Sequence, residues 1–184
     1  MKQKRLKLLL FVNLFSRIGF YFFSPFYALF AKDLGLGARD IGLIWAFYTL
    51  ASACFILIFG RFENKKPKAK LIILGSFIYT FCDLFLLYVH TPTLLIVALL
   101  INAFGAGISL PAYKTLFAKS QDHKRESEEW SWLDSSNMFA AAGGSALGGF
   151  ILGIFGFHGL FITMAMVQFV TATAAYHNLK RTKI

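Results

Sequence analysis

Cysteine, histidine and acidic residues are all scarce in this chain of 184 residues. The two cysteines, Cys54 and Cys82, form no CxxC pair, and the four histidines are scattered, so neither a disulfide framework nor a metal site is expected. The sequence also lacks HExxH, GxGxxG and P-loop patterns and any Ser-His-Asp candidate set. These absences argue against an enzyme and against a bound cofactor or metal.

Apolar residues, by contrast, make up 57% of the chain and gather in six long stretches. At ~1.5 Å per helical residue, each stretch can cross or nearly cross a hydrocarbon layer of ~30 Å. The connections between them are short and contain no low-complexity run or linker. We therefore predict one all-α transmembrane domain over residues 1–184. Its predicted spans are Leu8–Ala31, Ile41–Phe59, Leu71–Val89, Leu94–Phe117, Ser131–Phe155 and Leu160–His177.

Positive charge is abundant and unevenly placed, with 19 Lys and Arg against 9 Asp and Glu and a net charge of +10. All of the basic residues except Arg17, Lys32 and Arg39 fall on alternate connections or at the termini. Basic loops are retained on the cytoplasmic side, so both termini are predicted to be cytoplasmic in a plasma membrane. This placement, together with attraction to anionic head groups of the lipid bilayer, explains the charge without a nucleic-acid partner.

A weak internal repeat relates the first three predicted spans to the last three. Residues Pro25–Lys32 resemble Pro111–Lys119, and residues Phe55–Phe62 resemble Phe150–Phe157. Both matches pair one span with the third span after it, and those two spans run in opposite directions. Three-plus-three inverted repeats recur in secondary transporters, so the pattern favours a 3+3 inverted-repeat bundle.

Polar residues form stripes along the first and fourth predicted spans. Arg17 lies well inside the first span, where a charge costs ~2.5–3.5 kcal/mol on insertion scales. Two striped helices favour a shared water-accessible pathway, although a buried interhelical hydrogen-bond network would also explain them. The residues predicted to line the pathway are Asn13, Arg17, Ser24, Asn102, Ser109 and Tyr113.

Asp83 is the only acid deep inside a predicted span, and Ser76, Tyr79 and Thr80 share its helical face. It has two interpretations. An arginine side chain is long enough to reach from Arg17 to its depth, which favours a structural charge pair. Alternatively, Asp83 carries a proton during transport.

The fifth span has a face of small residues that lets another helix approach closely. That helix belongs either to the same bundle or to a second copy or partner. The glycines of this predicted helix-packing interface are Gly144, Gly148, Gly149 and Gly153.

Taken together, these motifs resemble the N-terminal half of a major facilitator superfamily transporter. The order of Pro25, Leu34–Leu36, Ile41–Leu43 and Gly60 is typical of that family, as is a glycine-containing end of the fourth helix before Pro111. The family's inner-loop motif, G-x-x-x-D-R-x-G-R-K, is altered here, with Asn64 in place of the acid and Pro67 in place of the second glycine. Its counterparts in this chain are Gly60, Glu63, Asn64, Lys65 and Lys68.

The resemblance implies that spans one and four line a central cavity, that span three is peripheral and that span five meets the other half of the transporter. It also implies alternating access by two six-helix halves. The expected function is secondary transport of a small solute, proton-coupled and with a slight lean towards export. The second half would be another copy in a homodimer or a separately encoded chain. The alternative is a non-transporting assembly or scaffold subunit or a truncated transporter fragment.

Overall fold

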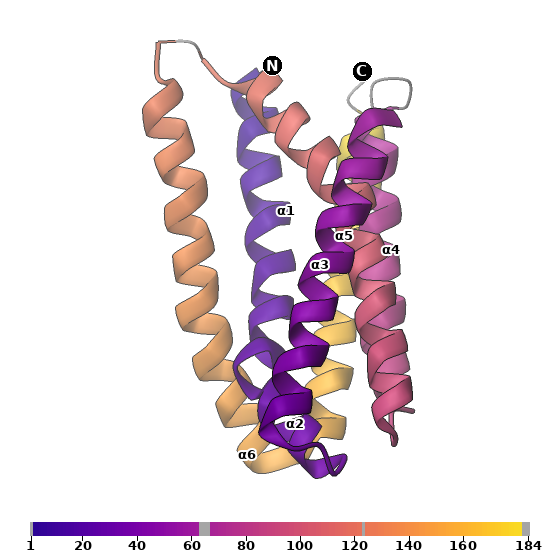
Figure 1. The fold of residues 1–184 in the computed structure, drawn as a ribbon. Helices are drawn as coiled ribbons and strands as arrows, with labels where there is room; N and C mark the ends of the chain where they lie inside the picture. Colours follow the sequence, from indigo (N-terminus) through magenta and orange to yellow (C-terminus); the bar gives the residue numbers. More distant parts are fainter. Residues whose placement is uncertain (1, 63–66, 123, 182–184) are drawn as a thin grey trace.

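The computed structural model describes residues 2–62, 67–122 and 124–181 and forms a bundle whose long helices run between the same two ends (Figure 1). All regular secondary structure in these residues is helical. Five helical segments within them are long and apolar enough to cross a membrane. The long elements are α1 (Lys2–Phe23), α3 (Ala38–Phe62), α4 (Lys68–Leu86), α5 (Pro92–Ser120) and α6 (Glu126–Arg181). The expectation of an all-α, multi-spanning protein is confirmed at this level.

The first predicted span is not one continuous helix. After α1 the chain forms a short 3₁₀ helix, η1 (Ser24–Phe26), and then α2 (Tyr27–Asp33). Pro25 lacks a backbone N–H and clashes with the preceding turn, which interrupts the α-helical hydrogen-bond pattern here. Gly35, with a φ of 84°, then ends α2 and donates its N–H to the carbonyl oxygen of Lys32 at 2.9 Å.

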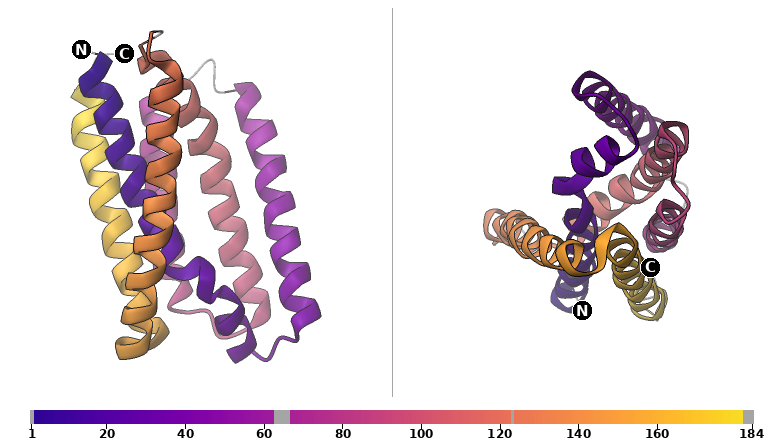
Figure 2. Two further views of the ribbon diagram at one scale, coloured as in Figure 1. Left: turned by 90° about the vertical axis from the view of Figure 1, so that its left-hand side faces the viewer. Right: turned by 90° about the horizontal axis from the view of Figure 1, so that it is seen from below.

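The last two predicted spans form a single element, α6, which consists of two helices joined at Gly156. The backbone of Gly156 has φ 65° and ψ −171°, a conformation essentially restricted to glycine. Because of this kink the two parts of α6 run in opposite directions (Figure 2). The connection between the fifth and sixth predicted spans is therefore a single turn of backbone at Gly156, after which helix resumes at once.

The start of α1 and the end of α6 lie at the same end of the bundle, together with the end of α3 and the start of α4 (Figure 1). This is the end to which the basic connections were assigned, and Arg5, Lys7 and Arg61 belong to it. The opposite end contains α2 and the kink in α6.

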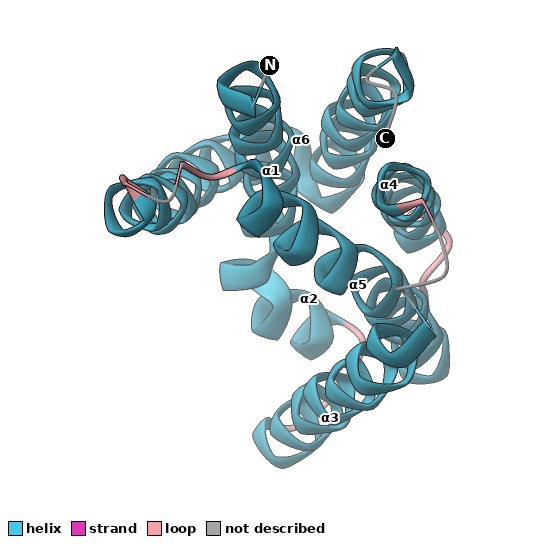
Figure 3. Ribbon diagram, turned by 90° about the horizontal axis from the view of Figure 1, so that it is seen from above, coloured by secondary structure: helices cyan, strands magenta, loops and turns pink. Residues whose placement is uncertain are grey.

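In the bundle, α1 packs against α6, α3 against α5, and α4 against both α5 and α6 (Figure 3). Two apolar clusters hold these helices together. One, near the basic end, includes Leu9 and Phe117. The other, near the opposite end, contains an aromatic group in which Phe30 and Phe161 meet edge to face, with ring centroids 5.1 Å apart. The space between the two clusters is where the polar residues gather.

Candidate functional site

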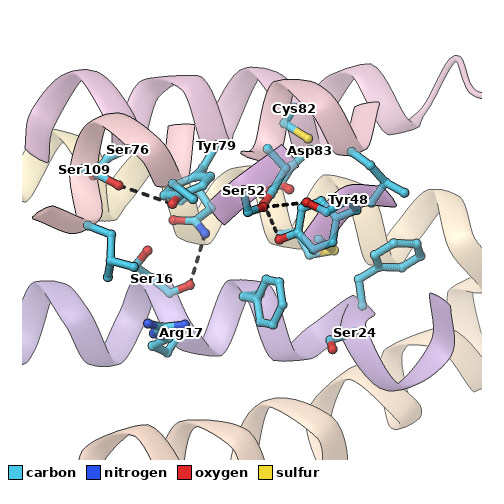
Figure 4. A pocket seen from close by; sticks show the side chains of 18 of the residues that line it. Ser16, Arg17, Ser24, Tyr48, Ser52, Ser76, Tyr79, Cys82, Asp83 and Ser109 are labelled. Carbon is cyan, nitrogen blue, oxygen red and sulfur yellow. Dashed lines mark hydrogen bonds between the residues drawn. The ribbon is translucent and has the colours of Figure 1, made fainter. Parts of the chain in front are cut away.

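A cavity of about 280 Å³ lies midway along the bundle, between the two apolar clusters. Residues of α1, η1, α3, α4, α5 and the second part of α6 form its walls. Figure 4 shows Arg17 on one side, facing polar and aromatic side chains of α3, α4 and α5 on the other. The walls thus combine one cation, one carboxyl group, several hydroxyl and amide groups and aromatic rings.

Every residue that the sequence assigned to a pathway lines this cavity. On α1 and η1 they are spaced four and seven residues apart, so that they lie on one helical face, which points inwards. The same periodicity brings the three residues of α5 to the opposite wall. They are Asn13, Arg17, Ser24, Asn102, Ser109 and Tyr113. The structure brings these side chains together, and their role in transport stays a prediction.

Arg17 is half-buried, and among the described residues its guanidinium group forms no hydrogen bond and no ion pair. Its charge lies close enough to the phenol groups of Tyr48, Tyr79 and Tyr113 to act on them electrostatically. A guanidinium group stays protonated in proteins. The cavity therefore contains a permanent positive charge that no described side chain neutralises.

Asp83, on α4, lines the same cavity and is only 3% exposed. Its Oδ2 atom is buried and has no hydrogen-bond partner within the described part of the chain. No ion pair joins Asp83 to Arg17 there, so in this conformation the two groups share a cavity without contact. The resemblance implied a peripheral third span, but α4 forms a full wall of the cavity, with Ser76 and Tyr79 beside Asp83.

The polar wall opposite Arg17 is held by hydrogen bonds between helices. Tyr48 of α3 donates to Oδ1 of Asn102 on α5 at 3.0 Å. Tyr79 of α4 and Ser109 of α5 share a hydrogen bond of 3.3 Å. These bonds fix the phenol hydroxyl groups and leave the ring faces as cavity surface. A partly apolar wall with a few positioned polar groups is typical of small-molecule sites.

The position of α1 is set by hydrogen bonds to its neighbours on three sides. Asn13 donates to Asn137 of α6 at 2.7 Å, and Gln168 of α6 donates to the carbonyl oxygen of Ser16 at 3.2 Å. Tyr113 of α5 donates to the carbonyl oxygen of Leu9 at 3.3 Å. The helix that presents Arg17 is therefore attached both to α5 and to each part of α6.

Sequence reasoning missed several cavity residues, above all those of α3. Tyr48 and Ser52 lie four apart on α3 and could have been found by the same periodicity that identified the first span. Gln168 is a lone amide in an apolar stretch, and this pattern indicates a cavity-lining position less strongly. By contrast, Thr80, expected on the face of Asp83, is turned back onto its own helix and donates to the carbonyl oxygen of Ser76 at 3.1 Å.

The glycine face of α6 packs against α1 of the same chain. A methyl group on Gly148 would come within 2.5 Å of the carbonyl oxygen of Phe22, and one on Gly144 within 2.9 Å of Cβ of Tyr21. Gly149 lies near the ring of Phe26, whereas nothing lies within 4 Å of a methyl group on Gly153. The resemblance implied that these glycines meet another half, but Gly144 and Gly148 meet α1 and Gly149 meets η1 of the same chain.

Most of the predicted inner-loop motif lies outside the described residues, namely Glu63, Asn64 and Lys65. Of the two described members, Gly60 lies near the end of α3, at contact distance from Pro111 of α5, and Lys68 is a buried residue at the start of α4. In the described part of the chain, no three His, Cys, Asp or Glu side chains are grouped so as to hold a metal ion.

A bundle of long apolar helices around a central polar cavity is the architecture of a multi-pass membrane protein. Comparison with known proteins gives the same result, since residues 9–183 match the sequence profile of the Major Facilitator Superfamily. The chain belongs to this family.

Two curated relatives are named for drug resistance. The chain is 27% identical over 159 residues to the multidrug resistance protein MdtH of Blochmanniella floridana, covering 86% of this chain and 40% of that protein. It is 21% identical over 162 residues to the quinolone resistance protein NorA of Staphylococcus aureus, covering 85% of this chain and 41% of NorA. The chain therefore spans about two fifths of the length of these relatives.

Solved structures with the same fold include two transporters of the POT family. The in meso crystal structure of PepTSo aligns with a TM-score of 0.78 at 18% identity, over 97% of this chain and 38% of that one. An auto-inhibited POT family peptide transporter also aligns with a TM-score of 0.78, at 20% identity, over 97% of this chain and 37% of that one. At this level of identity the likeness concerns the fold.

Proposed function

We propose that this chain forms a six-helix half of a secondary transporter that moves a small solute across the plasma membrane by alternating access. The observation that carries the proposal is the polar cavity at mid-length of the bundle, with Arg17 in its wall. A cation that deep costs ~2.5–3.5 kcal/mol on insertion scales. A bundle that only had to pack would gain stability by replacing it with an apolar residue.

The proposed topology has six spans in a 3+3 inverted-repeat arrangement, with both termini in the cytoplasm. The reversal of α6 at Gly156 supports the separation of its two parts into two spans. The basic residues near one end of the bundle support the orientation, because basic loops are retained on the cytoplasmic side.

We further propose that transport is proton-coupled and directed outwards. Asp83 supports the coupling because it is a buried carboxyl group in the cavity wall that could take up and release a proton. The names of the two curated relatives, which refer to multidrug and quinolone resistance, support export of organic solutes.

Alternating access requires a second half that rocks against the first around a midplane site. The proposal therefore includes such a half, supplied by another copy of this chain, by a separately encoded chain or by further residues of the same polypeptide. Native mass spectrometry after gentle extraction distinguishes a dimer from a monomer. A dimer would make flux assays on the chain alone informative.

A second candidate is a non-transporting assembly or scaffold subunit, or a truncated transporter fragment. The altered inner-loop motif favours it, because Asn64 and Pro67 stand where the family has an acid and a glycine. Without that acid, the loop lacks a charge that family members carry at this position.

Cysteine accessibility in membranes distinguishes the two candidates. In a chain with Cys54→Ser and Cys82→Ser, we would place single cysteines at Arg17 and Ser52, which line the cavity, and at Leu50, which is 64% exposed on the outer surface of α3. Charged thiol reagents should modify the first two and leave the control, which lies on the apolar outer surface, unmodified. Protection of both cavity positions in every state tested would overturn the transport proposal.

Flux provides the functional readout. In cells without their own drug exporters, the chain with its second half should lower the accumulation of a fluorescent quinolone, and Arg17→Leu should abolish that effect. Unchanged accumulation with the folded protein in the membrane would exclude quinolones as substrates.

A further inference from the structure

Two opposite charges line the cavity from different helices without meeting. Arg17 extends from α1 and Asp83 from α4, and each lacks a hydrogen bond or ion pair with any described residue (Figure 4). Both helices are held in place by hydrogen bonds that do not involve these two groups, such as Asn13 to Asn137 and Tyr79 to Ser109. Neither charged group is therefore needed to close the bundle.

Buried charges are normally paired, because removal from water is costly without a compensating partner. The guanidinium of Arg17 remains charged, and a carboxylate at Asp83 would be equally in need of a partner. One molecule that carries both an anionic and a cationic group would satisfy both at once.

The size and walls of the cavity narrow the class of molecule. A volume of about 280 Å³ is at the lower end of the range for small-molecule pockets, which suits a solute of the size of an amino acid. The same walls carry the aromatic rings of Tyr48, Tyr79, Phe20 and Trp45. Aromatic faces stabilise both apolar groups and organic cations.

We propose that the cavity binds a small zwitterion that carries a carboxylate, a protonated amine and an apolar, preferably aromatic, body. The carboxylate pairs with Arg17, where a guanidinium group can donate two parallel hydrogen bonds. The amine donates to the carboxylate of Asp83. This substrate class rests on the transport function proposed above, but binding can be tested without flux.

The test uses three matched probes with the purified full-length chain, followed by isothermal titration calorimetry. Phenylalanine carries both charges, phenylalaninamide only the cation, and N-acetylphenylalanine only the anion. Each charge-assisted contact is worth enough that phenylalanine should bind about tenfold more tightly than either single-charge probe. Because the comparison uses the unaltered protein, it does not depend on whether a variant folds.

Two variants then assign the ends of the ligand. Arg17→Gln should abolish the advantage of phenylalanine over phenylalaninamide, and Asp83→Asn should abolish its advantage over N-acetylphenylalanine. Leu50→Gln, on the outer surface, is the control and should change neither ratio.

Three results would overturn the proposal. Equal binding of N-acetylphenylalanine would mean that Asp83 is neutral and that the site takes anions, and equal binding of phenylalaninamide would mean that it takes cations. No binding of any probe to a chain shown to be helical and monodisperse would exclude the site altogether. Quinolone export without zwitterion selectivity would support the transport function and contradict the zwitterion site. Zwitterion binding without flux would support the site and contradict the transport function.

Discussion

Asn13 of α1 donates a hydrogen bond of 2.7 Å to the side-chain oxygen of Asn137 on α6, across 124 positions of sequence. Asn13 also lines the cavity, so this bond lies where α1 passes between the cavity and the first part of α6. Interhelical hydrogen bonds between side-chain amides contribute to helix association in membranes. The contact therefore ties the pathway-lining helix to the glycine-rich one.

Loss of this bond should lower the stability of the protein, and the effects of substituting its two partners should not be additive. Asn13→Ala and Asn137→Ala should each lower the free energy of unfolding by about 0.6–1.7 kcal/mol. The double variant should lose less than the sum, because the second substitution removes a group that has already lost its partner. Equilibrium unfolding in detergent micelles measures all three, with Thr49→Ala, a residue bonded only to its own helix, as the control. Strict additivity would contradict the contact.

A second prediction concerns the close packing of Gly148 against α1. Gly148→Ala places a methyl group 2.5 Å from the carbonyl oxygen of Phe22, a backbone atom that cannot rotate away, so α1 and α6 must separate. We expect a loss of about 1–3 kcal/mol of unfolding free energy, as for other overpacked sites. Gly153→Ala lies on the same helix with nothing within 4 Å and should be neutral or stabilising. Equal effects of the two substitutions would show that helix propensity, and not the close approach of α1, determines the change in unfolding free energy.

The sequence was sufficient to predict the helical membrane class and the inward-facing residues of α1 and α5. Both follow from length, hydropathy and helical periodicity, which are local properties of the chain. Arg17 and Ser109 were recognised because a polar residue in an apolar stretch is conspicuous. Tyr48 was not, since tyrosine is common at both lipid-facing and buried positions.

Other features depend on how the helices pack against one another, and helical periodicity in the sequence gives no information on that packing. That α4 forms a wall of the cavity, and that Gly148 faces α1, became clear only from the packing. The separation of Arg17 and Asp83 is a further example, because depth along two helices gives no distance between them. The reversal at Gly156 was expected, but its tightness follows from a single backbone conformation.

This conformation leads to a third prediction. At Gly156, φ 65° and ψ −171° are accessible to glycine but strained for any residue with a side chain. Gly156→Ala should therefore lower the unfolding free energy by about 1–3 kcal/mol, even though no atom lies within 4 Å of the added methyl group. Gly143→Ala, in a helical part of α6 with equally open space, should instead be stabilising by up to about 1 kcal/mol. Thermal unfolding monitored by circular dichroism compares them, and equal melting temperatures would contradict a strained turn.

The final prediction concerns the start of α6, outside the membrane-spanning part of the bundle. Arg125 donates two hydrogen bonds to Glu128, from Nε to Oε2 at 2.8 Å and from the terminal nitrogen to Oε1 at 2.7 Å. These bonds lower the pKa of the Glu128 carboxyl group below its ordinary value. Because the pKa is lower in the folded state, the pair's contribution to helix stability is present above the unfolded-state pKa and is lost as the pH falls through the folded-state pKa.

Carbon-13 NMR of a chain labelled at glutamate should thus show Glu128 titrating below the ordinary range of a glutamate side chain. Arg125→Gln should raise the Glu128 midpoint to the ordinary range, whereas Lys124→Gln, which removes a neighbouring cation without touching the pair, should leave it nearly unchanged. High salt should have a smaller effect than Arg125→Gln, because the two hydrogen bonds persist when long-range charge effects are screened. A midpoint that moves equally in both variants would mean that general positive potential, and not the bidentate contact, sets the pKa of Glu128.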